Sequence, residues 1–137
     1  VEAKSEEMNY SIQHFENYTL VAEEPGVDHL MFNKDDGLSM QIEVVTKEEA
    51  TFEQMNATAK ETISAIAPDS VKELDFSTIL TERPEILNIT GYEGVLDGEK
   101  VVKVVLERTN LIAALTIYDT PQADLTDAFL QMGLTIQ

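Results

Sequence analysis

The sequence predicts an α+β fold, in which an antiparallel β-sheet of about six or seven strands carries helices on its faces as an α/β/α sandwich. Two stretches predict it. Residues 86–119 alternate like three short strands joined by tight turns, and residues 51–67 have the apolar spacing of one helix. The chain of 137 residues suits one domain whose core needs no disulfide or metal.

The stretch 86–119 contains two turn signals, an Asp-Gly pair at 97–98 and a Thr-Asn pair at 109–110. Read as two-residue loops, the first places Gly91 opposite Val104 and the second places Val104 opposite Leu115. One face of this meander then carries eight small or apolar residues, with Glu93 near its end: Ile89, Gly91, Val102, Val104, Leu106, Ala113, Leu115 and Ile117. We expect the 51–67 helix to cover this face.

The 51–67 helix has signals at both ends. Thr51 and Gln54 form a capping box at its start, and Pro68 ends it. Its apolar stripe consists of Phe52, Met55, Ala59, Ile63 and Ile66.

A closing helix is predicted over residues 121–133. Thr120 can cap it, Pro121 suits its first position, and Gly133 suits its end. We expect this helix to cover part of the reverse face of the meander, which is half apolar.

The N-terminal half predicts further strands. A strand from Tyr18 to Ala22 ends at the Glu-Pro-Gly triplet 24–26, and residues 71–80 are predicted as another strand. A hairpin turns at the Asp-Asp-Gly triplet 35–37. Its expected pairs are Lys34 with Leu38, Phe32 with Met40, and Leu30 with Ile42.

The domain organisation follows from periodicity. Residues 1–13 carry three acidic residues and little periodicity, which predicts a flexible acidic N-terminal arm. Residues 14–137 are expected to form a single α+β domain.

The charge excludes one class of partner. Nine Lys and Arg face 26 Asp and Glu, for a formal net charge of −17. Nucleic-acid binding requires basic residues that neutralise phosphates, so we expect no nucleic-acid partner. Most of the acidic residues are expected to solubilise the surface; a basic protein partner or a divalent cation remains an alternative.

The chain has no cysteine, which excludes thiol catalysis, cysteine-ligated zinc and disulfides. This composition is consistent with an exported bacterial protein. The chain begins at Val1 without a methionine, and its longest clean apolar run, 111–115, is too short to cross a bilayer. We therefore expect an extracytoplasmic protein, anchored to a membrane through an upstream segment that has been removed, and no direct insertion of this chain.

The search for chemistry gives no catalytic, cofactor-binding or metal-binding residues. The sequence lacks a phosphate loop, a zinc-protease motif and a nucleophile elbow. Its two histidines, His14 and His29, lie in separate segments without metal-ligand spacing. The acidic residues at 35–36 and 97–99 are explained as turns, which we favour over a calcium site.

The order of elements resembles the Mog1/PsbP-like fold, an α/β/α sandwich around an antiparallel sheet. The resemblance runs from about Tyr18 onward. It rests on "YTLVAEEPGV" as an early strand that enters a Pro-Gly turn, on the 51–67 helix, on the 86–119 meander and on the 121–133 helix. It implies a mainly non-catalytic role, since members include photosystem accessory subunits, a binder of a nuclear-transport GTPase and bacterial envelope lipoproteins.

We therefore predict a non-catalytic extracytoplasmic binding or accessory domain, the soluble part of a bacterial lipoprotein. The predicted contact surface is whatever the closing helix leaves exposed of Tyr92, Val101, Val105, Ile112 and Tyr118. One alternative is a small hydrolase or ligand-binding enzyme that uses acidic residues and His29. Another is a cytoplasmic regulatory protein.

Overall fold

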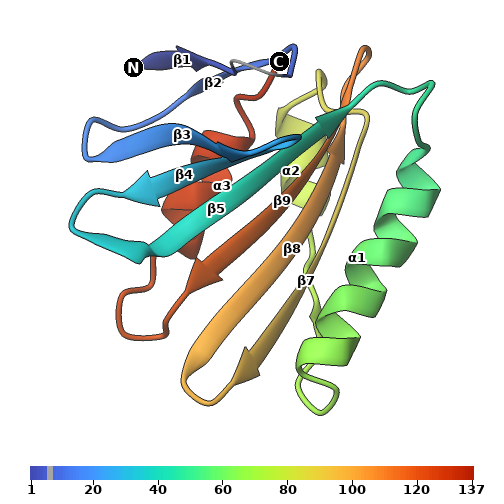
Figure 1. The fold of residues 1–137 in the computed structure, drawn as a ribbon. Coiled ribbons are helices and arrows are strands. Elements are labelled where there is room, and N and C mark those ends of the chain that lie inside the picture. Colours follow the sequence, from blue (N-terminus) through green and yellow to red (C-terminus); the bar gives the residue numbers. More distant parts are fainter. Residues whose placement is uncertain (6–7) are drawn as a thin grey trace.

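The computed structural model describes residues 1–5 and 8–137, and its centre is one seven-stranded antiparallel sheet (Figure 1). The strands lie in the order β3-β4-β5-β9-β8-β7-β6. Their bounds are β3 Tyr18–Glu24, β4 Val27–Phe32, β5 Asp35–Val45, β6 Lys72–Glu73, β7 Asn88–Leu96, β8 Glu99–Glu107 and β9 Ile112–Asp119. The remaining elements are the two-stranded ribbon of β1 Glu2–Lys4 and β2 Ser11–Gln13, and the helices α1 Phe52–Ile66, α2 Ser77–Glu82 and α3 Thr126–Gly133.

The predicted register of the meander is confirmed. Gly91 pairs with Val104 on β8, and Val104 pairs in turn with Leu115 on β9. The turn at 97–98 has both residues at positive φ, 52° and 79°, as a type I′ turn requires. Turn chemistry alone was therefore sufficient to align three strands.

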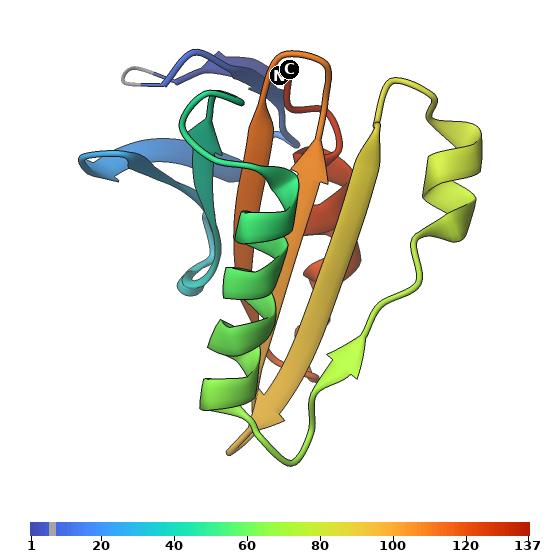
Figure 2. The ribbon, with the colours of Figure 1, turned by 90° about the vertical axis from the view of Figure 1, so that its right-hand side faces the viewer.

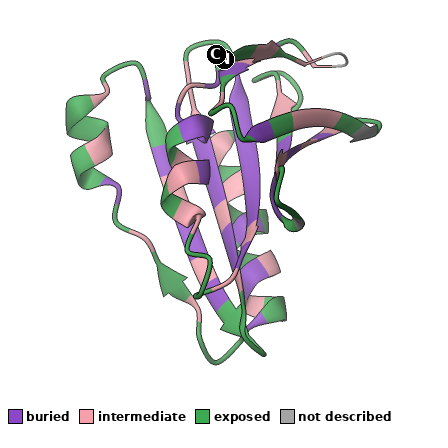
Figure 3. Ribbon diagram, turned by 90° about the vertical axis from the view of Figure 1, so that its left-hand side faces the viewer, coloured by how far each residue is buried: buried purple, intermediate pink, exposed green. Residues whose placement is uncertain are grey.

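The sheet is covered by different helices on its two faces (Figure 2). Helix α1 packs on β7 and β8 and buries Tyr92, Val105 and Ile112 against its own Ala59 and Ile63. Helix α3 and the C-terminal residues pack on the opposite face, over the strands coloured as buried in Figure 3.

The expected helix assignment was therefore wrong, because the two helices are exchanged. The face with Val104 and Leu115 lies under α3, where Phe129 and Met132 reach it, and α1 lies on the reverse face. Strand β8 explains why the pattern was ambiguous. It buries valines on both sides, Val102 and Val104 on one and Val101 and Val105 on the other, as expected of a strand between two helical layers.

The β4–β5 hairpin has a different register from the predicted one. Leu30 pairs with Met40 rather than with Ile42, since the chain turns at residues 33–34 and β5 contains an irregularity after Asp35. The Asp35 carboxylate accepts a hydrogen bond from the Gly37 N–H at 3.0 Å within this irregularity. The shift is by two residues, so every side chain keeps its predicted face.

The strand predicted over 71–80 is wrong for most of its length. Only Lys72–Glu73 pair, with β7. The Asp75 carboxylate then accepts the Ser77 N–H at 2.9 Å and turns the chain into α2. This hydrogen bond lowers the pKa of Asp75.

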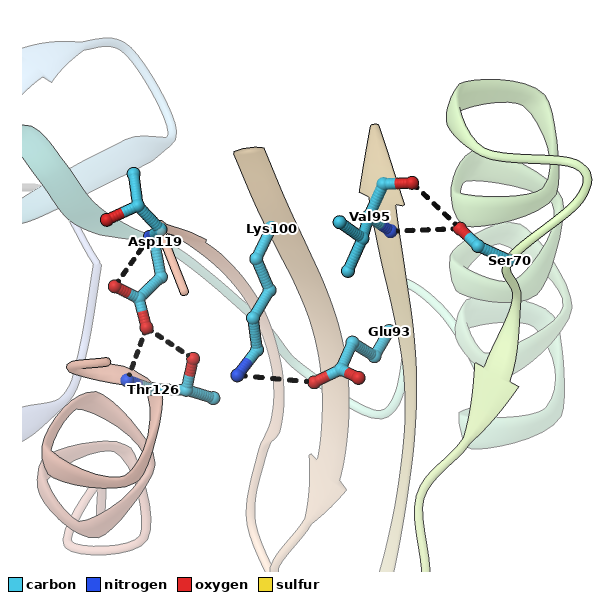
Figure 4. A network of polar contacts seen from close by, with 7 residues as sticks. Ser70, Glu93, Val95, Lys100, Asp119 and Thr126 are labelled. Atoms are coloured by element: carbon cyan, nitrogen blue, oxygen red, sulfur yellow. Dashed lines mark hydrogen bonds and ion pairs between the residues drawn. The ribbon is translucent and has the colours of Figure 1, made fainter. Parts of the chain in front are cut away.

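The closing helix begins later than predicted. Thr120 accepts the Ala123 N–H at 3.1 Å, but Asp124 adopts a φ of 52° and interrupts the turn. The buried Asp119 carboxylate starts α3 instead, by accepting bonds from the N–H and the hydroxyl of Thr126 at 2.8 and 2.6 Å (Figure 4). The start at 121 was therefore wrong, and the end at Gly133 is confirmed.

The described part of the predicted arm is not an arm but a packed ribbon. Its Tyr10 and Ile12 are buried in the core beside α3. The backbone of Ser11 exchanges two hydrogen bonds with that of Gln137, at 2.9 and 3.1 Å, which ties the ribbon to the C-terminal residues. Residues 6–7 of the predicted arm lie outside the described residues.

Candidate functional site

Four connections meet at one end of the sheet and enclose a hollow of about 390 Å³, which we call the loop-end hollow. They are the β1–β2 connection, the β3–β4 turn, the β5–α1 loop and the β8–β9 turn, at the top of Figure 1. The volume falls in the range of about 300–1,000 Å³ that small-ligand sites occupy. The lining residues are Met8, Asn9, Gly26, Glu43, Val44, Val45, Thr46, Glu49, Asn110 and Leu111.

The floor of the loop-end hollow is apolar. Leu111 is buried, and Met8 and Val44 are half-buried beside the core under α3. The Met8 sulfur accepts the Val44 N–H at 3.3 Å, so the N-terminal segment is held against the last residues of β5. The floor is thus built by packing between segments that lie far apart in the sequence.

The rim of the loop-end hollow is polar and acidic. Glu43, Glu49, Asn9 and Asn110 are all exposed. Glu43 lies in β5 near its end, and the other three lie in connections, where loops on a rigid sheet present binding groups. No Lys or Arg is among the lining residues.

Glu49 is held in place by a local motif. Its Oε1 accepts hydrogen bonds from the N–H and the hydroxyl of Thr46 at 3.0 and 3.1 Å. This Thr-x-x-Glu arrangement resembles a capping box and closes the turn from 46 to 50. One carboxylate oxygen is thereby committed to the turn.

Glu43 connects the loop-end hollow to the part of the sheet that α1 leaves uncovered. It also lines a hollow of about 30 Å³ with Gln41 of β5, Lys103 of β8 and Thr116 of β9. The three last-named residues are cross-strand neighbours on one face. The uncovered face is thus polar where it approaches the loop-end hollow.

Lys103 is the one basic residue in this polar row. Its Nζ donates to the Thr116 hydroxyl at 2.8 Å. Partial burial lowers the pKa of Lys103, and the nearby Glu43 carboxylate opposes that shift by favouring the charged form.

The predicted contact surface is not available for binding. Tyr92, Val101, Val105 and Ile112 are all buried, and all belong to the cluster packed under α1. Tyr118 is half-buried against the same cluster. This prediction was wrong because the reverse face of the meander has a helix of its own.

His29 does not lie in the loop-end hollow. It is half-buried on β4, opposite Val21 on β3 and Gln41 on β5. Neither the loop-end hollow nor the hollow beside Lys103 has it among its lining residues. In the described part of the chain, no group of three or more His, Asp or Glu side chains is placed to hold a metal ion.

Sequence reasoning missed the loop-end hollow, and no local signal could have found it. Its acidic rim residues are two among 26 acidic residues. Its floor depends on Met8, which lies in the stretch predicted as an arm. Only the fold brings these segments together.

No protein-family model matches the chain, and neither does any curated protein sequence. The solved structures that are similar in fold include two with 8% sequence identity each. One is cyanobacterial PsbP (CyanoP) from Synechocystis sp. PCC 6803, with a TM-score of 0.54 over 100% of this chain and 91% of that one. The other, from Bacteroides thetaiotaomicron VPI-5482, has a TM-score of 0.57 over 99% of this chain and 47% of that one.

These comparisons confirm the PsbP-like fold that the order of elements predicted. This chain spans about half the length of the Bacteroides protein. At such low identity the likeness concerns the fold alone, so no residue role is transferred.

Proposed function

We propose that the chain is a non-catalytic binding or accessory domain that works outside the cytoplasm, as the soluble part of a bacterial lipoprotein. The loop-end hollow is the observation that carries this proposal. It combines an apolar floor with exposed carboxylates and amides on a rigid sheet, which is the general form of a binding site. The likeness in fold to cyanobacterial PsbP is consistent with an accessory role.

Binding is favoured over catalysis by the chemistry of the lining. The hydroxyl of Thr46 donates to Glu49 within a tight turn, so this pair is committed to holding the turn. The described lining residues supply no histidine or lysine for proton transfer. They can position and hold a ligand by contact and hydrogen bonding.

The proposed location outside the cytoplasm is supported by composition. The chain has no cysteine and a formal net charge of −17, as suits a solvated domain in an oxidising compartment. No helix in residues 1–5 and 8–137 is long and apolar enough to cross a membrane. The proposed attachment to a membrane is a lipid anchor on an upstream segment.

Site-specific cross-linking in the cells that make the protein tests this proposal. A photo-reactive amino acid replaces Asn110 on the rim of the loop-end hollow in one strain, and exposed Leu80 on α2 in a control strain. We expect the protein in the envelope fraction and a cross-linked partner from position 110 but not from position 80. A cytoplasmic protein, or equal cross-linking from both positions, would contradict the proposal.

A further inference from the structure

The loop-end hollow has the chemistry of a site for a long basic side chain, and we infer that it holds a lysine or arginine side chain from a basic segment of a partner protein. This inference deepens the proposed function and rests on it. Lysine and arginine combine an apolar stem with a cationic head. The hollow offers the matching pair, an apolar floor at Met8 and Leu111 beneath an acidic rim.

The rim favours a cation over an anion. Glu43 and Glu49 are the acidic residues of the lining. Glu49 has one carboxylate oxygen engaged by Thr46, and the Glu43 carboxylate also lies near Lys103. The nearby lysines have other hydrogen-bond or ion-pair partners. Lys47 pairs with Glu107 at 3.1 Å, and Lys103 donates to Thr116 at 2.8 Å.

The rim also offers hydrogen-bond acceptors beyond the carboxylates. Asn9 and Asn110 are exposed lining residues, and an asparagine side chain has a carbonyl acceptor. A guanidinium has five N–H donors and an ammonium has three, so either head group can use several acceptors at once. A bare metal ion is a poorer fit, because no group of three acidic or histidine ligands is found among the described residues.

The charge of the whole chain favours a partner of opposite sign. A formal net charge of −17 attracts a basic protein segment over a distance and accelerates its encounter. The hollow then supplies the specific contact for one side chain. A small organic cation would use the same contacts but would gain less from the extended acidic surface.

Binding of labelled peptides to the full 137-residue chain tests the inference. The probe is a fluorescent peptide of alternating Arg and Ser. The comparison peptide has citrulline in place of every Arg, which keeps the shape and removes the charge. In fluorescence anisotropy at physiological salt, we expect at least tenfold tighter binding of the Arg peptide.

Matched variants separate the hollow from the general acidity of the surface. Glu43→Gln with Glu49→Gln removes two charges from the rim, and Glu53→Gln with Glu61→Gln removes two from the exposed side of α1. We expect the rim variant to bind the Arg peptide at least tenfold more weakly than the wild type, and the α1 variant to bind it within about twofold of the wild type. Equal losses in both variants would overturn the inference.

A third variant tests whether a loss of binding comes from changed charge rather than from unfolding of the rim. Asn110→Arg places a positive charge at an exposed position beside the hollow. We expect it to weaken binding of the Arg peptide and to leave the melting temperature unchanged. Arginine amide tests whether a small organic cation binds without a peptide segment. If arginine amide bound as tightly as the peptide, the hollow would be a site for a free cation, and the inference of a partner segment would be overturned.

The outcomes also distinguish this inference from the proposed function. A partner cross-linked at position 110, with no preference for the Arg peptide, would overturn the inference and leave the binding function standing. If the protein were found only in the cytoplasm but showed a rim-dependent preference for the Arg peptide, the inference would stand and the proposed function would be overturned.

Discussion

At the scale of the residue, Asp28 stands out because its carboxyl group is buried but only partly hydrogen-bonded. It is 1% exposed, and its Oδ2 accepts the Tyr10 hydroxyl at 2.6 Å, whereas its Oδ1 has no hydrogen-bond partner. Burial and the neighbouring Asp28 raise the pKa of Tyr10, which keeps its hydroxyl protonated as a donor. This contact joins the N-terminal ribbon to β4.

Removal of the Tyr10 hydroxyl leaves the buried carboxylate without a donor. We expect Tyr10→Phe to lower the free energy of unfolding by about 1–3 kcal/mol, the cost of an unsatisfied buried polar group. Tyr92→Phe is the matched control. Its partner, Asn56 Oδ1, keeps a second donor from Thr90 at 2.7 Å, so its loss should be smaller. Urea unfolding measures both, and a larger loss for Tyr92→Phe would contradict this reading.

Lys103 gives a prediction with a defined direction in pH. Burial lowers its pKa in the folded state below the usual 10.5, so the unfolded chain binds the proton more tightly just below pH 10.5. The stability of the wild type relative to Lys103→Met should therefore rise as the pH approaches 10.5. Lys60→Met, at an exposed position on α1, is the control. A relative stability that falls over this interval would contradict the assignment.

Single residues show where sequence reasoning works. The capping box of Thr51 and Gln54 was predicted and is present, because it depends on residues three apart. The cap of α3 was missed, because Asp119 reaches across seven residues to Thr126. Thr120 fits the local pattern equally well, and only the buried position of Asp119 decides between them.

At the scale of the element, the two faces of β9 should respond differently to the same change. Leu115→Asp buries a charge in the core under α3 and should cost more than the roughly 2–5 kcal/mol of truncating a buried leucine. Thr116→Asp places its carboxylate beside Lys103 Nζ, 2.8 Å from the present hydroxyl, and should cost at most about 2 kcal/mol. Thermal melts compare them, and equal melting temperatures would refute the register.

The position of α1 on the reverse face makes a separate prediction at Gly94. A Cβ there would lie 2.8 Å from the Ala67 Cβ and 3.1 Å from Ile63 at the end of α1. We expect Gly94→Ala to destabilise the fold by about 1–3 kcal/mol through overpacking. Adding Ala67→Gly removes the nearest atom and should restore part of the loss. Simple addition of the two single effects would show that α1 does not press on Gly94.

Elements differ in how far the sequence determines them. The register of β7 to β9 was predictable because two-residue turns fix it. The choice of helix for each face was not, because β8 presents valines on both faces and each helix has one apolar stripe. The strand over 71–80 failed because a single hydrogen bond to Asp75 turned an alternating pattern into α2.

At the scale of the whole molecule, the binding end is a product of topology. The hollow needs the β1–β2 ribbon to pack near the end of β5, and it needs the β8–β9 turn to reach the same end. Neither arrangement can be predicted from a local sequence pattern. The acidic balance of the chain was visible from composition, but its value for binding depends on which two carboxylates border an apolar floor.

The most direct measurement of this account is a titration of the ¹⁵N-labelled chain with the Arg peptide, followed through backbone amide chemical shifts. We expect the largest shifts at Val45, Thr46, Asn110 and Leu111, which line the loop-end hollow. The exposed apolar tip of the β7–β8 hairpin at Val95 and Leu96, which lies at the other end of the sheet, should shift little. Shifts centred on that tip, or spread evenly over the acidic surface, would contradict the account.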